Sequence, residues 1–112
     1  MPGFTRACAL ADVEEGTAIR VTIGTLPVAI VRTGDDVFAI HDVCSHANVA
    51  LSEGEIDDQT IECWLHGSRF DLVTGRPTGL PATKPVPVYP VKIDGDDVLI
   101  DVGAAVPLLK ES

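Results

Sequence analysis

A chain of 112 residues with 46% apolar residues is long enough for one folded domain and too apolar to be disordered. Its formal net charge of −9 repels phosphate backbones, so a basic protein surface is a better partner than nucleic acid. The same charge is equally consistent with a role in solubility alone.

The N-terminal residues, the apolar runs and the cysteines indicate a cellular compartment. Residues 1–4 lack a basic segment followed by an apolar run, and no stretch approaches the roughly 18 apolar residues that span a membrane. We therefore expect a cytoplasmic protein with no membrane partner. An odd number of cysteines in a reducing compartment, here Cys8, Cys44 and Cys63, favours metal binding or catalysis over a disulfide framework.

Short apolar runs separated by turns predict β-strands in the first half of the chain. Residues 4–10 are apolar enough for a first strand, in which Cys8 is expected to be a small core residue. Residues 17–23 alternate with a period of two. Residues 28–31 and 37–40 flank a turn sequence with Gly34 and are expected to form a hairpin.

The same pattern of two apolar runs that flank a glycine turn occurs again near the C-terminus. Residues 88–93 and 98–102 flank the turn sequence Asp94-Gly95-Asp96-Asp97, which predicts a second hairpin. Pro90 indicates an edge strand or an irregular start. No window has a sustained helical period with caps, so the sequence predicts an all-β, antiparallel sandwich or barrel with little helix.

The segment between the two hairpins, residues 41–81, contains the residues that suggest chemistry. Cys44 and His46 form a C-x-H motif, and after sixteen intervening residues Cys63 and His66 form a C-x-x-H-G motif. Two cysteines and two histidines in two short clusters predict a metal site. Each loop presents one thiolate and one imidazole.

Three readings of these motifs remain open on composition alone. A single zinc ion needs all four ligands to converge tetrahedrally, and zinc motifs more often place two cysteines close together. The alternation of Cys and His suits a two-iron cluster in which both thiolates bind one iron and both imidazoles the other. The third reading has no metal, with Cys63 as a buried apolar thiol and Cys44 and His46 as turn residues.

The pattern resembles the Rieske motif, and the similarity extends well beyond the four residues. It continues through Ser68-Arg69-Phe70-Asp71, Thr74-Gly75 and Gly79-Leu80-Pro81-Ala82 into residues 85–91. The sequence is most similar to the stand-alone ferredoxins of bacterial aromatic-ring-hydroxylating dioxygenase systems. The resemblance implies a single Rieske [2Fe–2S] domain over residues 1–112, an antiparallel β-sandwich or barrel whose small cluster-binding subdomain is formed by two loops.

The resemblance also implies a ligand set for one [2Fe–2S] cluster. Cys44 and Cys63 would bind the inner iron, while His46 and His66 would bind the outer iron near the surface. The segment Gly79-Leu80-Pro81 resembles the proline loop that covers such a cluster from a third side. No catalytic residue is implied.

Several positions depart from relatives of this kind. Val49 and Leu65 stand where respiratory Rieske proteins carry two further cysteines that tie the cluster loops together. Ser68 matches a serine of those proteins, but Phe70 stands where they have a tyrosine hydroxyl, so we expect a potential in the low part of the Rieske range. Trp64 follows the second cysteine, where many relatives have proline.

The implied function is that of a one-electron carrier and not of an enzyme. We expect a monomer that takes electrons from a flavin-dependent ferredoxin reductase and passes them to a terminal oxygenase. The chain has no dinucleotide-binding fingerprint and is too short for an oxygenase domain. The alternatives are a Rieske ferredoxin serving another redox or iron–sulfur assembly system, and a zinc-stabilised β-module that binds protein.

The sequence also predicts the environment of four further side chains. His41 is expected to be a strand-end histidine and not a ligand. Trp64 either packs beneath its loop or contributes to an apolar patch beside the cluster. Arg69 and Arg76 are expected to be solvated charges.

Overall fold

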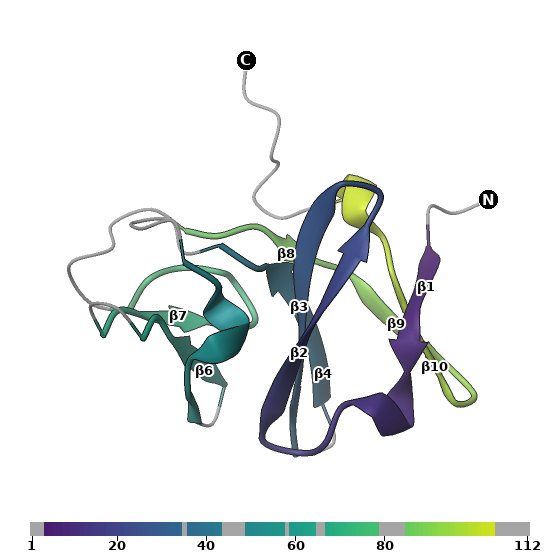
Figure 1. The fold of residues 1–112 in the computed structure, drawn as a ribbon, viewed down its shortest axis with the longest axis horizontal. Helices are drawn as coiled ribbons and strands as arrows, with labels where there is room; N and C mark the ends of the chain where they lie inside the picture. Colours follow the sequence, from purple (N-terminus) through teal and green to yellow (C-terminus); the bar gives the residue numbers. More distant parts are fainter. Residues whose placement is uncertain are drawn as a thin grey trace.

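The computed structural model describes residues 4–34, 36–43, 49–57, 59–64, 67–78 and 85–104. Within these ranges the chain forms short strands joined by turns and single-turn 3₁₀ helices (Figure 1). The strands are β1 (Thr5–Ala9), β2 (Thr17–Ile23), β3 (Leu26–Thr33), β4 (Asp36–His41), β5 (Ile56–Asp57), β6 (Thr60–Glu62), β7 (Arg69–Asp71), β8 (Val88–Tyr89), β9 (Val91–Asp94) and β10 (Asp97–Ile100). The 3₁₀ helices are η1 (Leu10–Asp12), η2 (Leu51–Glu53) and η3 (Val102–Ala104).

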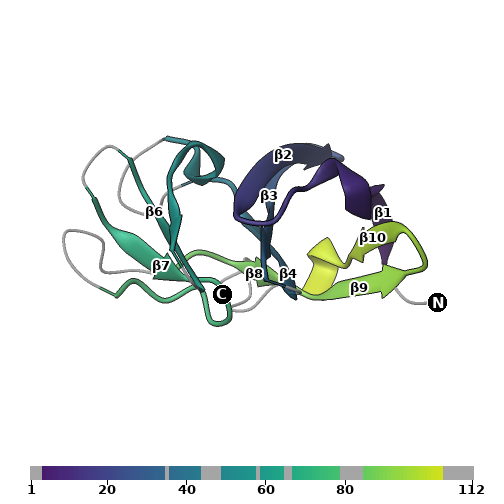
Figure 2. The same ribbon diagram turned by 90° about the horizontal axis from the view of Figure 1, so that it is seen from below.

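The described strands form three antiparallel sheets. Their strand orders are β1-β10-β9, β2-β3-β4-β8 and β5-β6-β7. The four-stranded sheet lies in the middle, with the β1-β10-β9 sheet on one side and the β5-β6-β7 sheet on the other (Figures 1 and 2). The antiparallel all-β fold predicted from the sequence is therefore confirmed. No helix in the described ranges is long and apolar enough to cross a membrane.

Strand β3 is buried on both of its faces. Successive side chains of a strand point to opposite faces, and the four residues from Val28 to Val31 are all fully buried. Val28 and Ile30 pack into one apolar cluster, whereas Ala29 and Val31 pack into another. A continuous apolar run, in place of alternation, is what a strand between two apolar layers requires.

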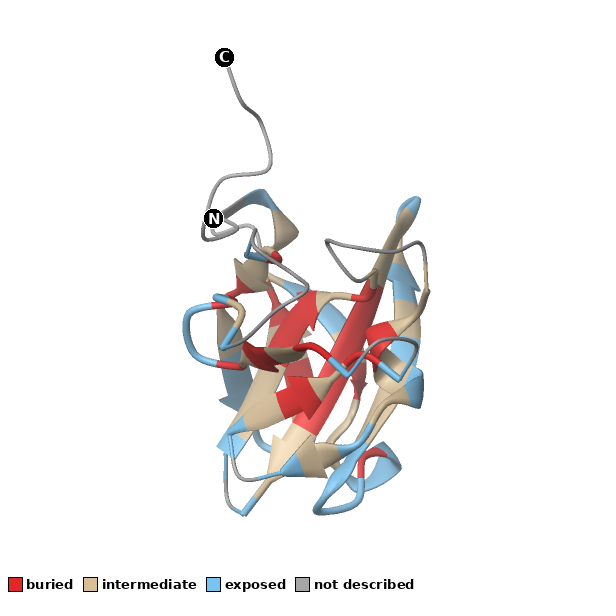
Figure 3. Ribbon diagram, turned by 90° about the vertical axis from the view of Figure 1, so that its left-hand side faces the viewer, coloured by how far each residue is buried: buried red, intermediate tan, exposed pale blue. Residues whose placement is uncertain are grey.

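The two apolar clusters lie on either side of the central sheet, and Figure 3 shows the buried residues concentrated there. The first cluster, which joins the central sheet to the β5-β6-β7 sheet, contains Ala29, Val31, Ile40, Leu51, Ile61, Cys63, Phe70, Leu72 and Val86. The second, which joins it to the β1-β10-β9 sheet, contains Cys8, Val13, Val28, Ile30, Ala39, Tyr89, Val98 and Ile100. Cys8 is 6% exposed, as expected for a core residue.

The observed hairpins match the predicted ones in part. Strands β3 and β4 form the predicted hairpin, with Val31 opposite Phe38 and a positive φ at Gly34. Strand β2 also pairs with β3, a hairpin that the sequence did not indicate. The predicted strand over residues 88–93 is divided at Pro90, so that β8 joins the central sheet and β9 pairs with β10. Proline has no N–H to donate, which ends the ladder at that point.

The β5-β6-β7 sheet was not predicted. Its strands have two or three residues each, which is too short for an alternation of period two to be recognised. Gly54, just before β5, allows the backbone of β6 to approach closely, because a Cβ at position 54 would overlap the backbone carbonyl of Glu62. The sheet thus depends on a glycine as well as on apolar residues.

Gly75 has a similar role where the chain returns from the small sheet. Its φ is +78°, and a Cβ there would overlap the carbonyl oxygen of Val86. The carbonyl of Gly75 accepts a hydrogen bond from the Val86 N–H at 2.8 Å. Gly24 provides a comparison, because its φ is +64° but nothing lies within 4 Å of its Cβ position.

We expect Gly75→Ala to cost clearly more stability than Gly24→Ala. Both variants carry the strain of a left-handed backbone, about 1–2 kcal/mol. Gly75→Ala should lose about a further 1–3 kcal/mol, because the new methyl group displaces the Val86 backbone. Urea unfolding of the two variants measures this difference directly, and equal losses would contradict a close contact at Gly75.

Candidate metal centre

Of the four predicted ligands, Cys63 lies within the described part of the chain. Cys44, His46 and His66 fall outside the described residues, as does the predicted proline loop at Gly79-Leu80-Pro81. The relative positions of the four predicted ligands therefore lie outside the described part of the chain. Among the residues it describes, no group of three or more His, Cys, Asp or Glu side chains could hold a metal ion. What it does describe is the base of each loop that carries the motifs.

The loop that bears the second motif is closed by hydrogen bonds at its base. Cys63 follows β6 directly, and its N–H donates to the Ser68 carbonyl at 2.6 Å. The Gly67 N–H in turn donates to the Cys63 carbonyl at 2.8 Å, with Gly67 at a φ of +78°. Glycine adopts this conformation without strain. The β6–β7 hairpin thereby fixes the backbone of Cys63.

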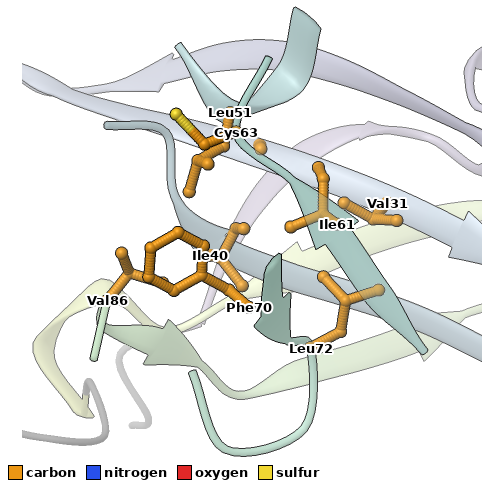
Figure 4. Close-up of a cluster of buried hydrophobic side chains, with 9 residues drawn as sticks. Val31, Ile40, Leu51, Ile61, Cys63, Phe70, Leu72 and Val86 are labelled. Carbon is orange, nitrogen blue, oxygen red and sulfur yellow. The ribbon is translucent and has the colours of Figure 1, made fainter. Parts of the chain in front are cut away.

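The Cys63 side chain is fully buried at the edge of the first apolar cluster. Figure 4 shows it beside Leu51, with its sulfur directed away from Phe70 and Leu72. Among the described residues, Cys63 and Cys8 are both free thiols. A free, shielded sulfur on a rigid hairpin fits a thiolate ligand, because water is kept from the metal–sulfur bond on that side.

The loop that bears the first motif is also held at its base. Asp42 directly follows β4, and its carboxylate is fully buried. The backbone N–H of Ser52 donates to Asp42 Oδ1 at 2.6 Å, and Ser52 Oγ donates to Oδ2 at 2.7 Å. Because Ser52 belongs to η2, these bonds join the two ends of the segment between residues 42 and 52.

A third segment returns to the small sheet at both of its described ends. The Thr78 N–H donates to the Arg69 carbonyl at 2.8 Å, just before the predicted proline loop. The Val86 N–H donates to Gly75 just after it. Two of the three segments are thus anchored at or beside the β5-β6-β7 sheet, whereas the first is anchored to η2. Phe70, on the edge strand β7 of that sheet, is fully buried.

The exposed and charged residues around this sheet exclude one of the two alternatives for Trp64 and revise the expectation for Arg69. Trp64 is 51% exposed and does not pack beneath its loop. Arg69 is not the solvated charge that was predicted, because its guanidinium contacts Glu62 Oε1 at 3.4 Å and Thr60 Oγ1 at 3.2 Å and is half-buried. Arg76 is exposed, as expected.

His41 occupies the last position of β4, as predicted for a strand-end histidine. The ring Nδ1 of His41 lies 3.4 Å from the hydroxyl oxygen of the buried Tyr89. The backbone N–H of His41 donates to the Pro87 carbonyl at 2.9 Å. Burial lowers the pKa of His41 from its ordinary value of 6.5, while the neighbouring Asp42 acts in the opposite direction.

The sequence did not single out Asp42, Ser52 or Arg20, whose Nε lies 3.4 Å from Asp42 Oδ2. An acidic residue after a strand is usually a solvated turn residue, so its full burial has no signal in the sequence. The distance of ten residues to Ser52 and twenty-two to Arg20 also hides the contact.

Comparison with known families decides the class of protein to which these loops belong. Residues 3–90 match the family model described as the Rieske [2Fe–2S] domain. The chain belongs to the Rieske family. This Rieske protein therefore contains a domain that implies a [2Fe–2S] cluster, and the predicted resemblance is confirmed.

Individual relatives agree with the family. The Rieske chain is 48% identical over 103 residues to the 3-phenylpropionate/cinnamic acid dioxygenase ferredoxin subunit of Escherichia coli K12, covering 90% of this chain and 95% of the relative. The ferredoxin of carbazole 1,9a-dioxygenase from Nocardioides aromaticivorans IC177 superposes with a TM-score of 0.83 at 38% identity, covering 87% and 95% of the two chains.

A chain from a complex of reduced oxygenase and oxidised ferredoxin in carbazole 1,9a-dioxygenase also has a TM-score of 0.83. The identity is 36%, and the match covers 90% of this Rieske chain and 94% of the other. The similarity therefore extends over nearly the whole of both chains. It is not confined to the motif segment.

The lowered pKa of His41 predicts a pH-dependent contribution to stability. The unfolded chain takes up this proton near pH 6.5, before the folded chain does, so the contribution is complete above about pH 6.5 and is lost as the pH falls below it. His41→Gln should lose less stability than the wild type between pH 7 and pH 5.

Urea unfolding midpoints at these two pH values measure the effect. The matched control is Tyr89→Phe, which removes the hydroxyl partner and keeps the imidazole, so it should retain the wild-type pH dependence. An identical slope in His41→Gln and the wild type would show that His41 makes no such contribution.

Proposed function

We propose that this Rieske protein is a one-electron carrier that passes electrons from a flavin-dependent reductase to a terminal oxygenase. The observation that supports this most strongly is the 48% identity, over 90% of the chain, to a protein named as the ferredoxin subunit of a dioxygenase. In that system the ferredoxin is a component of electron transfer and not the catalytic enzyme.

We further propose the four ligands of the cluster. Cys44 and Cys63 bind one iron, and His46 and His66 bind the other. The buried free thiol of Cys63 at the fixed end of a hairpin supports this assignment. When bound, a [2Fe–2S] cluster with mixed Cys and His ligands supplies a one-electron couple at about −150 to +300 mV, compared with about −400 mV for plant-type ferredoxins.

The described residues around Cys63 are consistent with a protein that holds a redox cluster and docks to a partner. Phe70, Leu51 and Ile61 form a dry apolar base beneath Cys63. Phe70 has no hydroxyl to donate to a sulfur, which supports a potential in the low part of the Rieske range. Trp64, directly after Cys63, is half-exposed and offers a large apolar surface for a partner.

Metal and sulfide analysis tests the ligand assignment. The wild type should contain two irons and two acid-labile sulfides per chain and give a Rieske-type EPR signal after reduction with dithionite. Cys63→Ser and His66→Ala should lose both the iron and the signal, because each removes one ligand and metal binding also stabilises the fold.

The matched control for Cys63→Ser is Cys8→Ala. Both residues are buried free cysteines, but Cys8 lies in the second apolar cluster, beyond the central sheet. Cys8→Ala should keep its iron. One zinc and no sulfide in the wild type would favour a zinc-stabilised β-module, and full iron content in Cys63→Ser would show that Cys63 is not a ligand.

We expect Trp64→Ala to slow electron transfer to the oxygenase about five- to thirtyfold, as loss of an aromatic residue at an interface centre costs about 1–2 kcal/mol. Stopped-flow kinetics at low ferredoxin concentration measures the second-order rate constant, with Val73→Ala as control. Val73 is 53% exposed but lies at the opposite end of the β6–β7 pair. Equal rates in both variants would exclude docking at Trp64.

The net charge of −9 adds an expectation for salt. If a partner presents a basic surface, the second-order rate constant falls as salt screens the attraction. A rate constant that is the same at low and high salt would leave the acidity as a solubility feature.

A further inference from the structure

The buried carboxylate of Asp42 joins three separate parts of the chain. Its two oxygens receive the N–H and O–H of Ser52 from η2, and Arg20 of β2 approaches Oδ2 at 3.4 Å. The backbone N–H of Asp42 donates to the Pro27 carbonyl of β3 at 3.0 Å. Asp42 is therefore fixed through both its side chain and its backbone.

The donor set around Asp42 is that of a negative charge. A carboxylate that accepts hydrogen bonds from a backbone N–H and a hydroxyl, and pairs with a guanidinium at 3.4 Å, has a partner at both oxygens, as a buried charge must. Its side chain is 0% exposed, whereas that of Arg20 is 50% exposed. Water therefore screens the positive charge more than the negative charge.

Covalent geometry keeps the backbone of Asp42 close to that of a proposed ligand. Asp42 stands two residues before Cys44, so their Cα atoms are at most about 7 Å apart whatever the backbone conformation. A negative charge near a redox centre disfavours the addition of an electron, and a compensating positive charge offsets that effect. In a partly dry site such effects are larger than in water.

We propose that Asp42, Ser52 and Arg20 form a charge-compensated clamp at the base of the first ligand loop. In this clamp the Asp42–Ser52 bonds position the loop, and the Asp42–Arg20 pair adjusts the reduction potential of the centre. All three are positioning residues and none is a ligand. The inference rests on the proposed function, because it requires a cluster bound through Cys44.

The Asp42–Arg20 pair predicts opposite shifts in the reduction potential when one or the other charge is removed. Arg20→Gln leaves the buried carboxylate uncompensated, so the potential should fall. Asp42→Asn removes the negative charge, so the potential should rise. Both substitutions weaken the same contact, and a purely structural role would therefore move the two potentials in the same direction. Opposite shifts are specific to the electrostatic role.

An EPR-monitored redox titration of the purified holoprotein tests the electrostatic half. Arg20→Gln should lower the equilibrium constant for reduction about three- to tenfold, and Asp42→Asn should raise it by a similar factor, where tenfold corresponds to 59 mV for one electron. Arg20→Lys keeps the charge and should restore a potential near that of the wild type.

The matched control is the exposed ion pair of Arg6 and Asp97, at 2.9 Å in the β1-β10-β9 sheet. Arg6→Gln removes the same type of charge on the far side of the central sheet and should leave the potential unchanged. Ser52→Ala tests the positioning half, because it keeps both charges. It should lose its visible absorbance several-fold faster than the wild type in the presence of a chelator, with little change in potential.

The outcomes separate the clamp from the proposed function. A wild type without a Rieske EPR signal would overturn both. A wild type with that signal, together with an Arg20→Gln potential that is unchanged or raised, would overturn the clamp alone. If Asp42→Asn fails to retain its cluster, Arg20→Gln and Arg20→Lys still decide the electrostatic half, since Arg20 is half-exposed and its replacement leaves no buried cavity.

Discussion

The burial of β3 on both faces is the constraint on which the rest of the molecule depends. Val28 and Ile30 close one apolar cluster, and Ala29 and Val31 close the other, so one strand supports the outer sheet and the small sheet at once. Cys63 belongs to the first apolar cluster, which contains Ala29 and Val31. A polar residue in this run would therefore disturb the side of the molecule that holds Cys63 even though the strand carries none of the proposed ligands.

Sequence patterns predicted the parts of the fold that consist of long, regular strands. The period of two over residues 17–23 and the glycine turn at Gly34 were confirmed, because local backbone preference determines both. Pro90 does lie between two edge strands, as expected, but the assignment of those strands to different sheets and the small β5-β6-β7 sheet were missed. Both depend on packing between distant segments, and another backbone passes close to the glycines at 54 and 75.

The candidate site likewise has a local part that the sequence predicts and a non-local part that it does not. Its ligand motifs are local and can be read from spacing, and Cys63 lies buried on a hairpin that suits the predicted role. Its supporting contacts are not local. Asp42, Ser52 and Arg20 meet across three elements, and the ion pair of Arg69 with Glu62 crosses between two strands that the sequence did not indicate. Family similarity predicts ligands more readily than it predicts the residues that hold them.

The pairing of β1 with β10 has a consequence for the order of folding. Thr5 lies opposite Ile100, so the outer sheet closes a loop of nearly the entire chain, whereas β2, β3 and β4 are joined by two adjacent hairpins. Local hairpins form in microseconds, while contacts between residues far apart in sequence form slowly. During synthesis the central sheet can therefore assemble early, but one face of β3 stays exposed to water until the final strands have left the ribosome. The acidic net charge offers some protection against aggregation in that interval.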